Sequence, residues 1–220
     1  MADVHARNAA QSLWVKICGI TNADDALAAR EFGADAIGLN CFRGSKRYVD
    51  LQQASDWITA LPAALTKVAI LVDAPFEDAI SIARLPFIDA LQLHGHETPE
   101  FCSQLAAAGV RFSKALAVTE KTLPGSGAIF HTDTIVLDSI SRGKFGGTGK
   151  AFPWHLARQF AESQPQLRII LAGGLTPENV EAAVREVRPL GVDVTSGVEG
   201  APGRKDHRAL RRFIDAARRA

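Results

Sequence analysis

The fold is decided by the stretch RIILAGGLTPENVEAAVREVRPLGVDVTSGV, residues 168–198. It opens with a short apolar run, passes through a glycine pair into a segment of helical period, and ends with a second β-branched run. Short runs rich in Ile and Val are typical of buried strands, and the longer segment between them indicates a helix. Strands joined in this way pair in parallel through a right-handed crossover, so the stretch predicts one β/α/β unit.

The same alternation recurs on the N-terminal side of this unit and once more after it. Including the quoted stretch, the predicted strands are 13–18, 34–40, 67–72, 88–93, 112–117, 134–138, 168–172 and 192–195. The predicted helices are 22–32, 51–61, 76–85, 99–108, 153–163, 177–187 and 206–218. The connection 118–128 contains Pro124, Gly125 and Gly127, which predicts a short or degenerate helix there.

Eight strands alternating with helices predict a single (β/α)8 TIM barrel over residues 13–220, with a short or degenerate fifth helix. An open, doubly wound sheet is the competing fold, but no GxGxxG motif follows the first strand. Polar residues also end at least five strands, which suits the single mouth of a barrel. Residues 1–12 are expected to form an extension that is disordered or lies on the surface.

Composition and charge argue against a nucleic-acid-binding protein, a membrane protein and a disulfide-rich protein. Lys and Arg total 25 against 24 Asp and Glu, and the net charge of +1 predicts no general attraction to nucleic acid or to an anionic membrane. No run of about 18 apolar residues suggests a membrane span. Cys18, Cys41 and Cys102 do not form a disulfide framework or a CxxC metal motif, so we expect a reducing, cytoplasmic location.

Two glycine-containing strand ends predict a phosphate-binding site. Gly173 and Gly174 follow the seventh strand, and Ser196 and Gly197 follow the eighth, so backbone amides of both loops can approach one ligand closely. Tight turns without a ligand are the alternative. The basic segment 203–205 is predicted to be a solvated turn outside the site, and Arg168 to be structural because it begins a strand.

Candidate acid and base residues end two further strands. Cys18 closes the first strand and can serve as a base or a nucleophile if positive charge activates it. Lys16 lies on the same face of that strand and can supply this charge. Asp138 closes the sixth strand and is a candidate general acid. Asp193 lies within the last strand, where a carboxylate needs a partner, and we expect it to orient the site.

Further polar residues are expected to contact the substrate. Gln92 and His94 lie on one face of the fourth strand end, where they can line the mouth. Arg47 can hold a carboxylate with two parallel hydrogen bonds, while Arg43 and Lys46 are expected to face solvent. His94 has no second ligand at metal-binding spacing, so no metal site is predicted.

A glycine-rich loop follows the predicted sixth strand. Gly146, Gly147, Thr148 and Gly149 lie within it, and its glycines permit hinge-like torsions. Its place after Asp138 predicts a lid that excludes water from the acid, with a plain flexible connector as the alternative.

Seven motifs now point to one family. They are Lys16-Ile17-Cys18-Gly19-Ile20-Thr21, Ser45-Lys46-Arg47-Tyr48, Gln92-Leu93-His94-Gly95, Leu137-Asp138, Gly146-Gly147-Thr148-Gly149-Lys150, Gly173-Gly174-Leu175-Thr176-Pro177-Glu178-Asn179 and Val192-Asp193-Val194-Thr195-Ser196-Gly197-Val198-Glu199. In these motifs, over residues 14 to about 215, the chain resembles phosphoribosylanthranilate isomerase of tryptophan biosynthesis. The cysteine and aspartate together carry this resemblance more specifically than the glycine pairs do.

The resemblance implies an Amadori rearrangement of a small phosphorylated substrate without a cofactor. It implies that Asp138 protonates the ribose ring oxygen, that Cys18 removes the proton from the adjacent sugar carbon, and that Arg47 holds the anthranilate carboxylate. The chain departs from the family in the loop 40–44, which lacks an aromatic-proline run. The sequence leaves both a monomer and a homodimer open.

Other functions of a phosphate-binding barrel are an epimerase, an indole-forming synthase, or a silent barrel that only binds a metabolite. Cys18 with Asp138 argues against the first two, and His94 alone cannot supply the ligands of a metal-dependent epimerase. Retention of both a candidate acid and a candidate base argues against the third.

Overall fold

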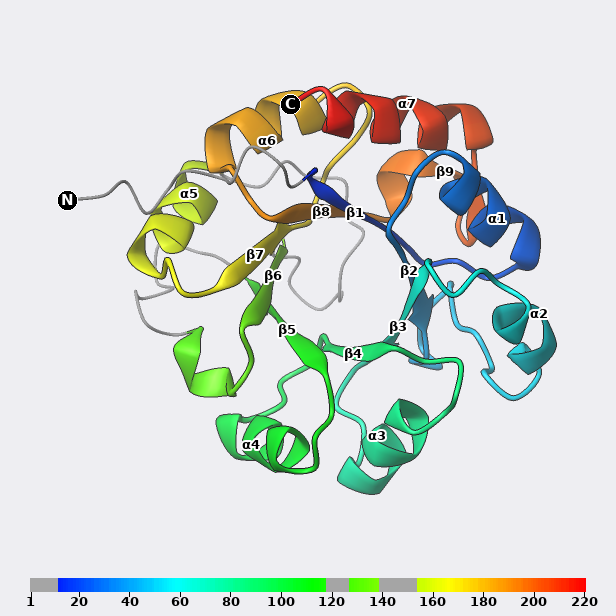
Figure 1. Ribbon diagram of the computed structural model, residues 1–220, viewed down its shortest axis with the longest axis vertical. Coiled ribbons are helices and arrows are strands. Elements are labelled where there is room, and N and C mark those ends of the chain that lie inside the picture. Colours follow the sequence, from blue (N-terminus) through cyan, green and yellow to red (C-terminus); the bar gives the residue numbers. More distant parts are fainter. Residues whose placement is uncertain (1–11, 118–126, 139–153) are drawn as a thin grey trace.

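A closed barrel of parallel strands forms the centre of the protein, and helices surround it (Figure 1). The computed structural model describes residues 12–117, 127–138 and 154–220. The barrel strands pair in the order β1 to β8, and β8 returns to pair with β1. The predicted (β/α)8 barrel is therefore confirmed, whereas the predicted N-terminal extension lies outside the described residues except for Ser12.

Each predicted strand is present, with small differences at the ends. The barrel strands are β1 Trp14–Cys18, β2 Ala36–Asn40, β3 Thr66–Leu71, β4 Ala90–Leu93, β5 Phe112–Ala117, β6 Thr134–Asp138, β7 Arg168–Leu171 and β8 Gly191–Val194.

The surrounding helices of the described chain are α1 Ala23–Glu31, α2 Ser55–Thr59, α3 Phe76–Ala83, α4 Pro99–Ala107, α5 Trp154–Ser163, α6 Val180–Val187 and α7 His207–Arg218. Between β5 and β6, the described residues form only a 3₁₀ turn, η1 Ala128–Phe130. The rest of the connection for which a short or degenerate fifth helix is predicted, 118–126, lies outside the described residues.

Two predicted helices begin later than expected, because side chains hold the preceding residues in turns. Before α2, the Asp50 carboxylate accepts from the N–H groups of Gln52 and Gln53. Before α6, the Asn179 side chain accepts from Thr176 N and donates to Gly174 O. The prediction that a helix begins at Pro177 was therefore wrong by three residues, since α6 begins at Val180.

Local capping explains where three of the other helices begin. Asn22 accepts from Asp25 N at the start of α1, and Thr98 accepts from Phe101 N before Pro99 at the start of α4. Asp206 accepts from two N–H groups at the start of α7. These side chains satisfy N–H groups that have no partner within the helix.

Hydrophobic side chains form two layers on the two faces of the strands. Outward-facing residues such as Ile17, Leu91 and Leu137 join the helices in one large core. A smaller cluster of Ala115, Val136, Ile170 and Ala172 fills part of the barrel interior. Alternating strand residues therefore serve both layers, as the period of two requires.

A small hairpin that was not predicted follows β8. After the 3₁₀ turn η2 Ser196–Val198, strands β9 Glu199–Ala201 and β10 Arg204–Lys205 pair in antiparallel fashion. Gly203 adopts φ +79° between them, a conformation that favours glycine. Thr21 donates from its hydroxyl to Gly203 O at 2.6 Å, which ties the hairpin to the loop after β1.

A buried ion pair holds the loop after β4. Lys114 Nζ lies 2.8 Å from Glu97 Oε2, and both side chains are almost completely buried. Lys114 also donates to Gly95 O, while Glu97 accepts from the N–H groups of Gly95 and Asp73. The pair thereby fixes the backbone directly after His94.

We expect Lys114→Met to destabilise the protein by about 3 kcal/mol, because it leaves the Glu97 carboxylate buried without its cation. Chemical denaturation measures the change in free energy of unfolding. The control is Arg158→Ala, which breaks an exposed pair with Glu162 and should cost less than about 0.5 kcal/mol. Equal losses in the two variants would contradict the importance of the buried pair.

Candidate active site

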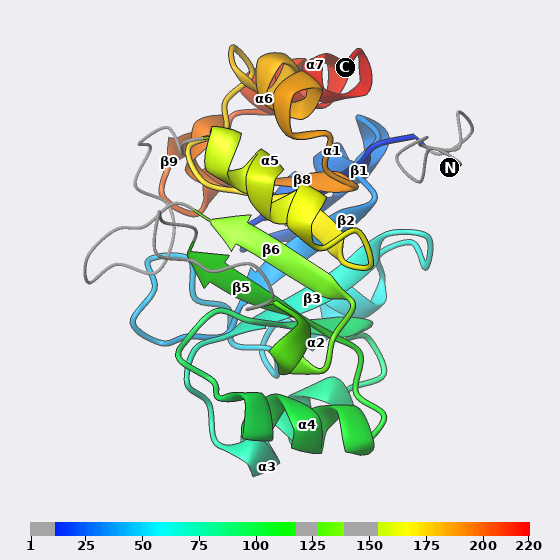
Figure 2. The same cartoon turned by 90° about the vertical axis from the view of Figure 1, so that its left-hand side faces the viewer.

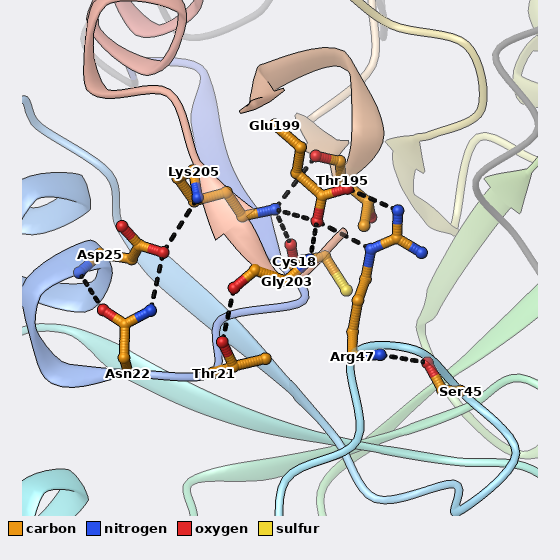
Figure 3. A network of polar contacts seen from close by, with 10 residues as sticks. All are labelled: Cys18, Thr21, Asn22, Asp25, Ser45, Arg47, Thr195, Glu199, Gly203 and Lys205. Carbon is orange, nitrogen blue, oxygen red and sulfur yellow. Dashed lines mark hydrogen bonds and ion pairs between the residues drawn. The ribbon is translucent and has the colours of Figure 1, made fainter. Parts of the chain in front are cut away.

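The carboxyl ends of the parallel strands meet at one end of the barrel, as they do in every closed parallel barrel. Figure 2 shows β5 and β6 from the side, with their arrowheads directed towards the edge where β9 lies. Cys18 ends β1 and Asp138 ends β6, so both predicted catalytic residues lie at this end. Figure 3 shows the residues around Cys18.

Cys18 is a buried, unpaired cysteine whose side chain fits against Gly38 of β2. A Cβ atom on Gly38 would lie 2.7 Å from Cys18 Sγ, so only glycine leaves room for the thiol. Burial raises the pKa of the Cys18 thiol, and Asp193 adds to this effect. Lys16, Lys205 and the Thr195 hydroxyl oppose it by stabilising the thiolate.

Lys16 and Asp193 form a buried ion pair inside the barrel, with 2.5 Å between Nζ and Oδ2. They face each other across the β1–β8 pairing. Burial disfavours the charge of Lys16, but Asp193 and Cys18 raise its pKa overall. The expected partner of Asp193 is therefore Lys16, and the pair places a cation beside Cys18.

Arg47 lies beside the end of β1 and is held by a carboxylate that the sequence did not suggest. Its Nε and Nη2 donate to Glu199 Oε1 and Oε2 at 2.8 and 2.5 Å. These hydrogen bonds raise the pKa of Arg47, and despite its own burial Glu199 has a lowered pKa because of Arg47 and Lys205. Gly19, with φ +74°, makes this approach possible, because a Cβ there would lie 2.6 Å from Arg47 Cδ.

The prediction that 203–205 is a solvated turn was wrong for Lys205. Arg204 is exposed, but Lys205 is buried and its Nζ donates to Cys18 O at 2.7 Å and to Thr195 O at 3.0 Å. The same atom lies 3.2 Å from Glu199 Oε1. A strand of two residues is too short for its alternation of buried and exposed side chains to be recognised in a sequence.

A second group of predicted residues surrounds Asp138. His94 Nε2 lies 3.1 Å from Asp138 Oδ2, and His94 Nδ1 lies 3.0 Å from Gln92 Nε2. Because the amide nitrogen of Gln92 only donates, Nδ1 accepts and the ring proton lies on Nε2, facing Asp138. Gln92 and His94 thus orient Asp138 in this arrangement.

The predicted phosphate-binding residues lie in adjacent loops at the same end. Gly173 and Gly174 adopt φ +79° and +66°, and Ser196 and Gly197 lie in η2. A Cβ on Gly197 would overlap with the Leu175 carbonyl oxygen, so the second loop packs directly on the first. The predicted lid residues, 146–149, lie outside the described residues.

A cavity of about 430 Å³ opens at the opposite end of the barrel, between strand-start residues such as Trp14, Thr134 and Arg168. It contains neither Cys18 nor Asp138, so it is not the candidate active site. Arg168 lies there at the start of β7, as expected for a residue that begins a strand, and it is exposed. Within the described ranges, no cluster of three or more His, Cys, Asp or Glu residues could hold a metal ion.

Comparison with known proteins identifies the family of this chain. Residues 15–216 match the family model of N-(5'phosphoribosyl)anthranilate (PRA) isomerase. The chain belongs to the PRA isomerase family. A curated PRA isomerase from Magnetococcus marinus is 46% identical over 206 residues, covering 94% of this chain and 95% of the relative.

Solved PRA isomerases have the same fold. A monomeric form of the dimeric PRA isomerase from Thermotoga maritima is 35% identical, with a TM-score of 0.81. A PRA isomerase in complex with reduced 1-(O-carboxyphenylamino)-1-deoxyribulose 5-phosphate is also 35% identical, with a TM-score of 0.82. Each match covers 94% of this chain and 100% of the solved chain.

We expect His94 to carry its proton on Nε2 in the native protein and to lose this preference in Gln92→Leu, which has no donor for Nδ1. Nitrogen chemical shifts of labelled histidine rings measure the tautomer, and the spectrum of His94→Gln assigns the signal among the six histidines. A proton on Nδ1 in the native protein would contradict the orientation of Asp138 by this pair.

Proposed function

We propose that this protein catalyses the Amadori rearrangement of N-(5'-phosphoribosyl)anthranilate to 1-(2-carboxyphenylamino)-1-deoxyribulose 5-phosphate in tryptophan biosynthesis. The observation that carries the proposal is the presence of Cys18 and Asp138 at the same end of a barrel of the PRA isomerase family. Both residues have the side chains that the reaction needs, one to take a proton from carbon and one to give a proton to oxygen.

The proposed chemistry moves hydrogen within one molecule. Asp138, in its acid form, protonates the ring oxygen as the bond from that oxygen to the first sugar carbon breaks, which leaves an iminium group. The Cys18 thiolate then removes the proton from the second sugar carbon and gives an enol. Return of the proton from Cys18 to the first carbon, with loss of the enol hydroxyl proton to the Asp138 carboxylate, converts the enol to the ketone and restores both residues. No oxidant or reductant is consumed, and we propose no cofactor.

Arg47 is the proposed clamp for the anthranilate carboxylate. Glu199 already occupies the edge formed by Nε and Nη2. The other edge, formed by Nη1 and the second proton of Nη2, can donate two hydrogen bonds to a second carboxylate in the same bidentate geometry. Glu199 therefore serves to orient the guanidinium, and its charge is offset by Lys205.

The loops at Gly173, Gly174, Ser196 and Gly197 are the proposed phosphate site, because small residues let backbone N–H groups approach an anion. A phosphate bound there anchors one end of the substrate and Arg47 the other. The sugar then lies between the acid and the base, which lowers the entropic cost of reaction. We propose Asp193 as the residue that keeps Lys16 beside Cys18, and residues 146–149 as a lid.

Assembly and location are part of the proposal. The T. maritima relative is dimeric, and we propose a monomer or a homodimer for this chain. All three cysteines are free, which suits the reducing cytoplasm. Across the described helices, none is long and apolar enough to cross a membrane.

We expect Cys18→Ser and Asp138→Asn each to lower kcat by about 100-fold or more, the usual contribution of a general acid or base. The assay follows the fluorescence of phosphoribosylanthranilate with purified protein and no added cofactor. Cys41→Ser and Asp133→Asn are matched controls and should retain turnover. Near-native turnover in either first variant contradicts its role, and no turnover in the native protein favours a silent binding barrel.

We expect Arg47→Ala to raise KM by about 10-fold to 100-fold with a smaller effect on kcat, because a charge-assisted bidentate contact is lost. Steady-state kinetics measure both constants, and Arg43→Ala in the same loop is the control. An inhibitor without the carboxylate should bind native protein and variant alike. If Arg47→Ala weakens the binding of this inhibitor as much as it weakens the binding of the carboxylate-bearing form, Arg47 has another role.

A further inference from the structure

The hairpin β9–β10 brings charged residues to the end of β8, which directly precedes it, and to the end of β1, which lies far from it in sequence. In Figure 3, Glu199 and Lys205 point towards each other above the end of β1, with Cys18 and Arg47 beside them. Gly203 N also donates to Glu199 Oε1, and Lys205 N donates to Asp25 Oδ2 of α1. The first bond closes the hairpin on itself, and the second holds it to α1.

The surroundings of Lys205 require a charged ammonium group. Its Nζ has three acceptors: the carbonyl oxygens of Cys18 and Thr195 and the carboxylate of Glu199. An ammonium has three protons to give, whereas a neutral amine has two and would direct its lone pair at an acceptor. Burial lowers the pKa of Lys205, but this geometry favours the protonated form at neutral pH.

The charges around Cys18 come from several elements. Lys16 lies on β1, Asp193 on β8, Lys205 on β10 and Arg47 in the loop after β2. Glu199 on β9 bonds to both Arg47 and Lys205, while Asp25 on α1 is paired with His207. Lys16 is neutralised by Asp193, and Glu199 balances only one of its two cations. The excess positive charge favours an anion at Cys18.

We propose that Lys205 is a positioning residue for the isomerisation. Lys205 joins the ends of β1 and β8 and supplies the positive charge that stabilises the Cys18 thiolate. The inference rests on the proposed function, in which Cys18 is the base. Lys205 does not need to touch the substrate, because its hydrogen bonds end on the backbone of Cys18 and Thr195 and on Glu199.

The direct test measures how the alkylation of Cys18 by iodoacetamide depends on pH, with mass spectrometry to separate the three cysteines. Burial raises the pKa of Cys41 to about 12 and that of Cys102 to about 11, so both provide internal references. In Lys205→Met and Lys205→Gln, we expect the midpoint for Cys18 to move up by about one pH unit. Arg204→Met removes the neighbouring exposed charge and should leave the midpoint unchanged.

Turnover provides the second readout. A shift of about one pH unit lowers the thiolate fraction about tenfold, so kcat at neutral pH should fall about tenfold in both Lys205 variants and recover at alkaline pH. A purely structural role would lower kcat at every pH without moving the midpoint. If Lys205→Met does not fold, Lys205→Gln, which keeps polar donors, decides the question.

An unchanged Cys18 midpoint in a folded Lys205 variant overturns the inference. The alkylation experiment does not depend on the substrate. Absence of isomerisation in the native protein would therefore refute the proposed function, while the effect of Lys205 on Cys18 would still be measured.

Discussion

The pairing of β1 with β8 is the contact on which the rest of the structure depends. It closes the barrel through the register Trp14↔Gly191 to Ile17↔Val194, between segments at opposite ends of the sequence. Lys16 and Asp193 face each other in this register, and their ion pair is buried inside the barrel. Closure also brings Cys18 to Thr195 and the hairpin, so the proposed base and the proposed phosphate loops become neighbours only through this contact.

The strands and the ends of the barrel could be predicted from the sequence, because alternating apolar runs and glycine pairs are local signals. Cys18, Asp138, Gln92 and His94 were recognised because each ends a strand or lies next to its end. Helix starts were less accurate where a side chain competes for the backbone, as Asn179 does before α6. Such a bond is local, but the residue type alone does not reveal which backbone groups the side chain binds.

The network around Lys205 and Glu199 could not be predicted for a related reason. Both residues lie in a polar segment that is typical of a surface turn, and their burial results from packing against β1 and β8. The space at Gly38 and Gly19 was also missed, since neither the fit of the Cys18 thiol nor that of Arg47 is encoded in neighbouring residues. Long-range contacts of this kind need the closed fold before they can be identified.

The hairpin that carries Lys205 has a consequence for how the protein is made. Cys18 ends the first strand of the barrel, but its charged partner follows 187 positions later in the chain. Because domains fold as their elements emerge from the ribosome, β1 must wait with an unpaired edge until β8 and the hairpin are complete. The nascent chain therefore cannot assemble the proposed base during most of its synthesis, and the slow formation of such distant contacts makes barrel closure a late step.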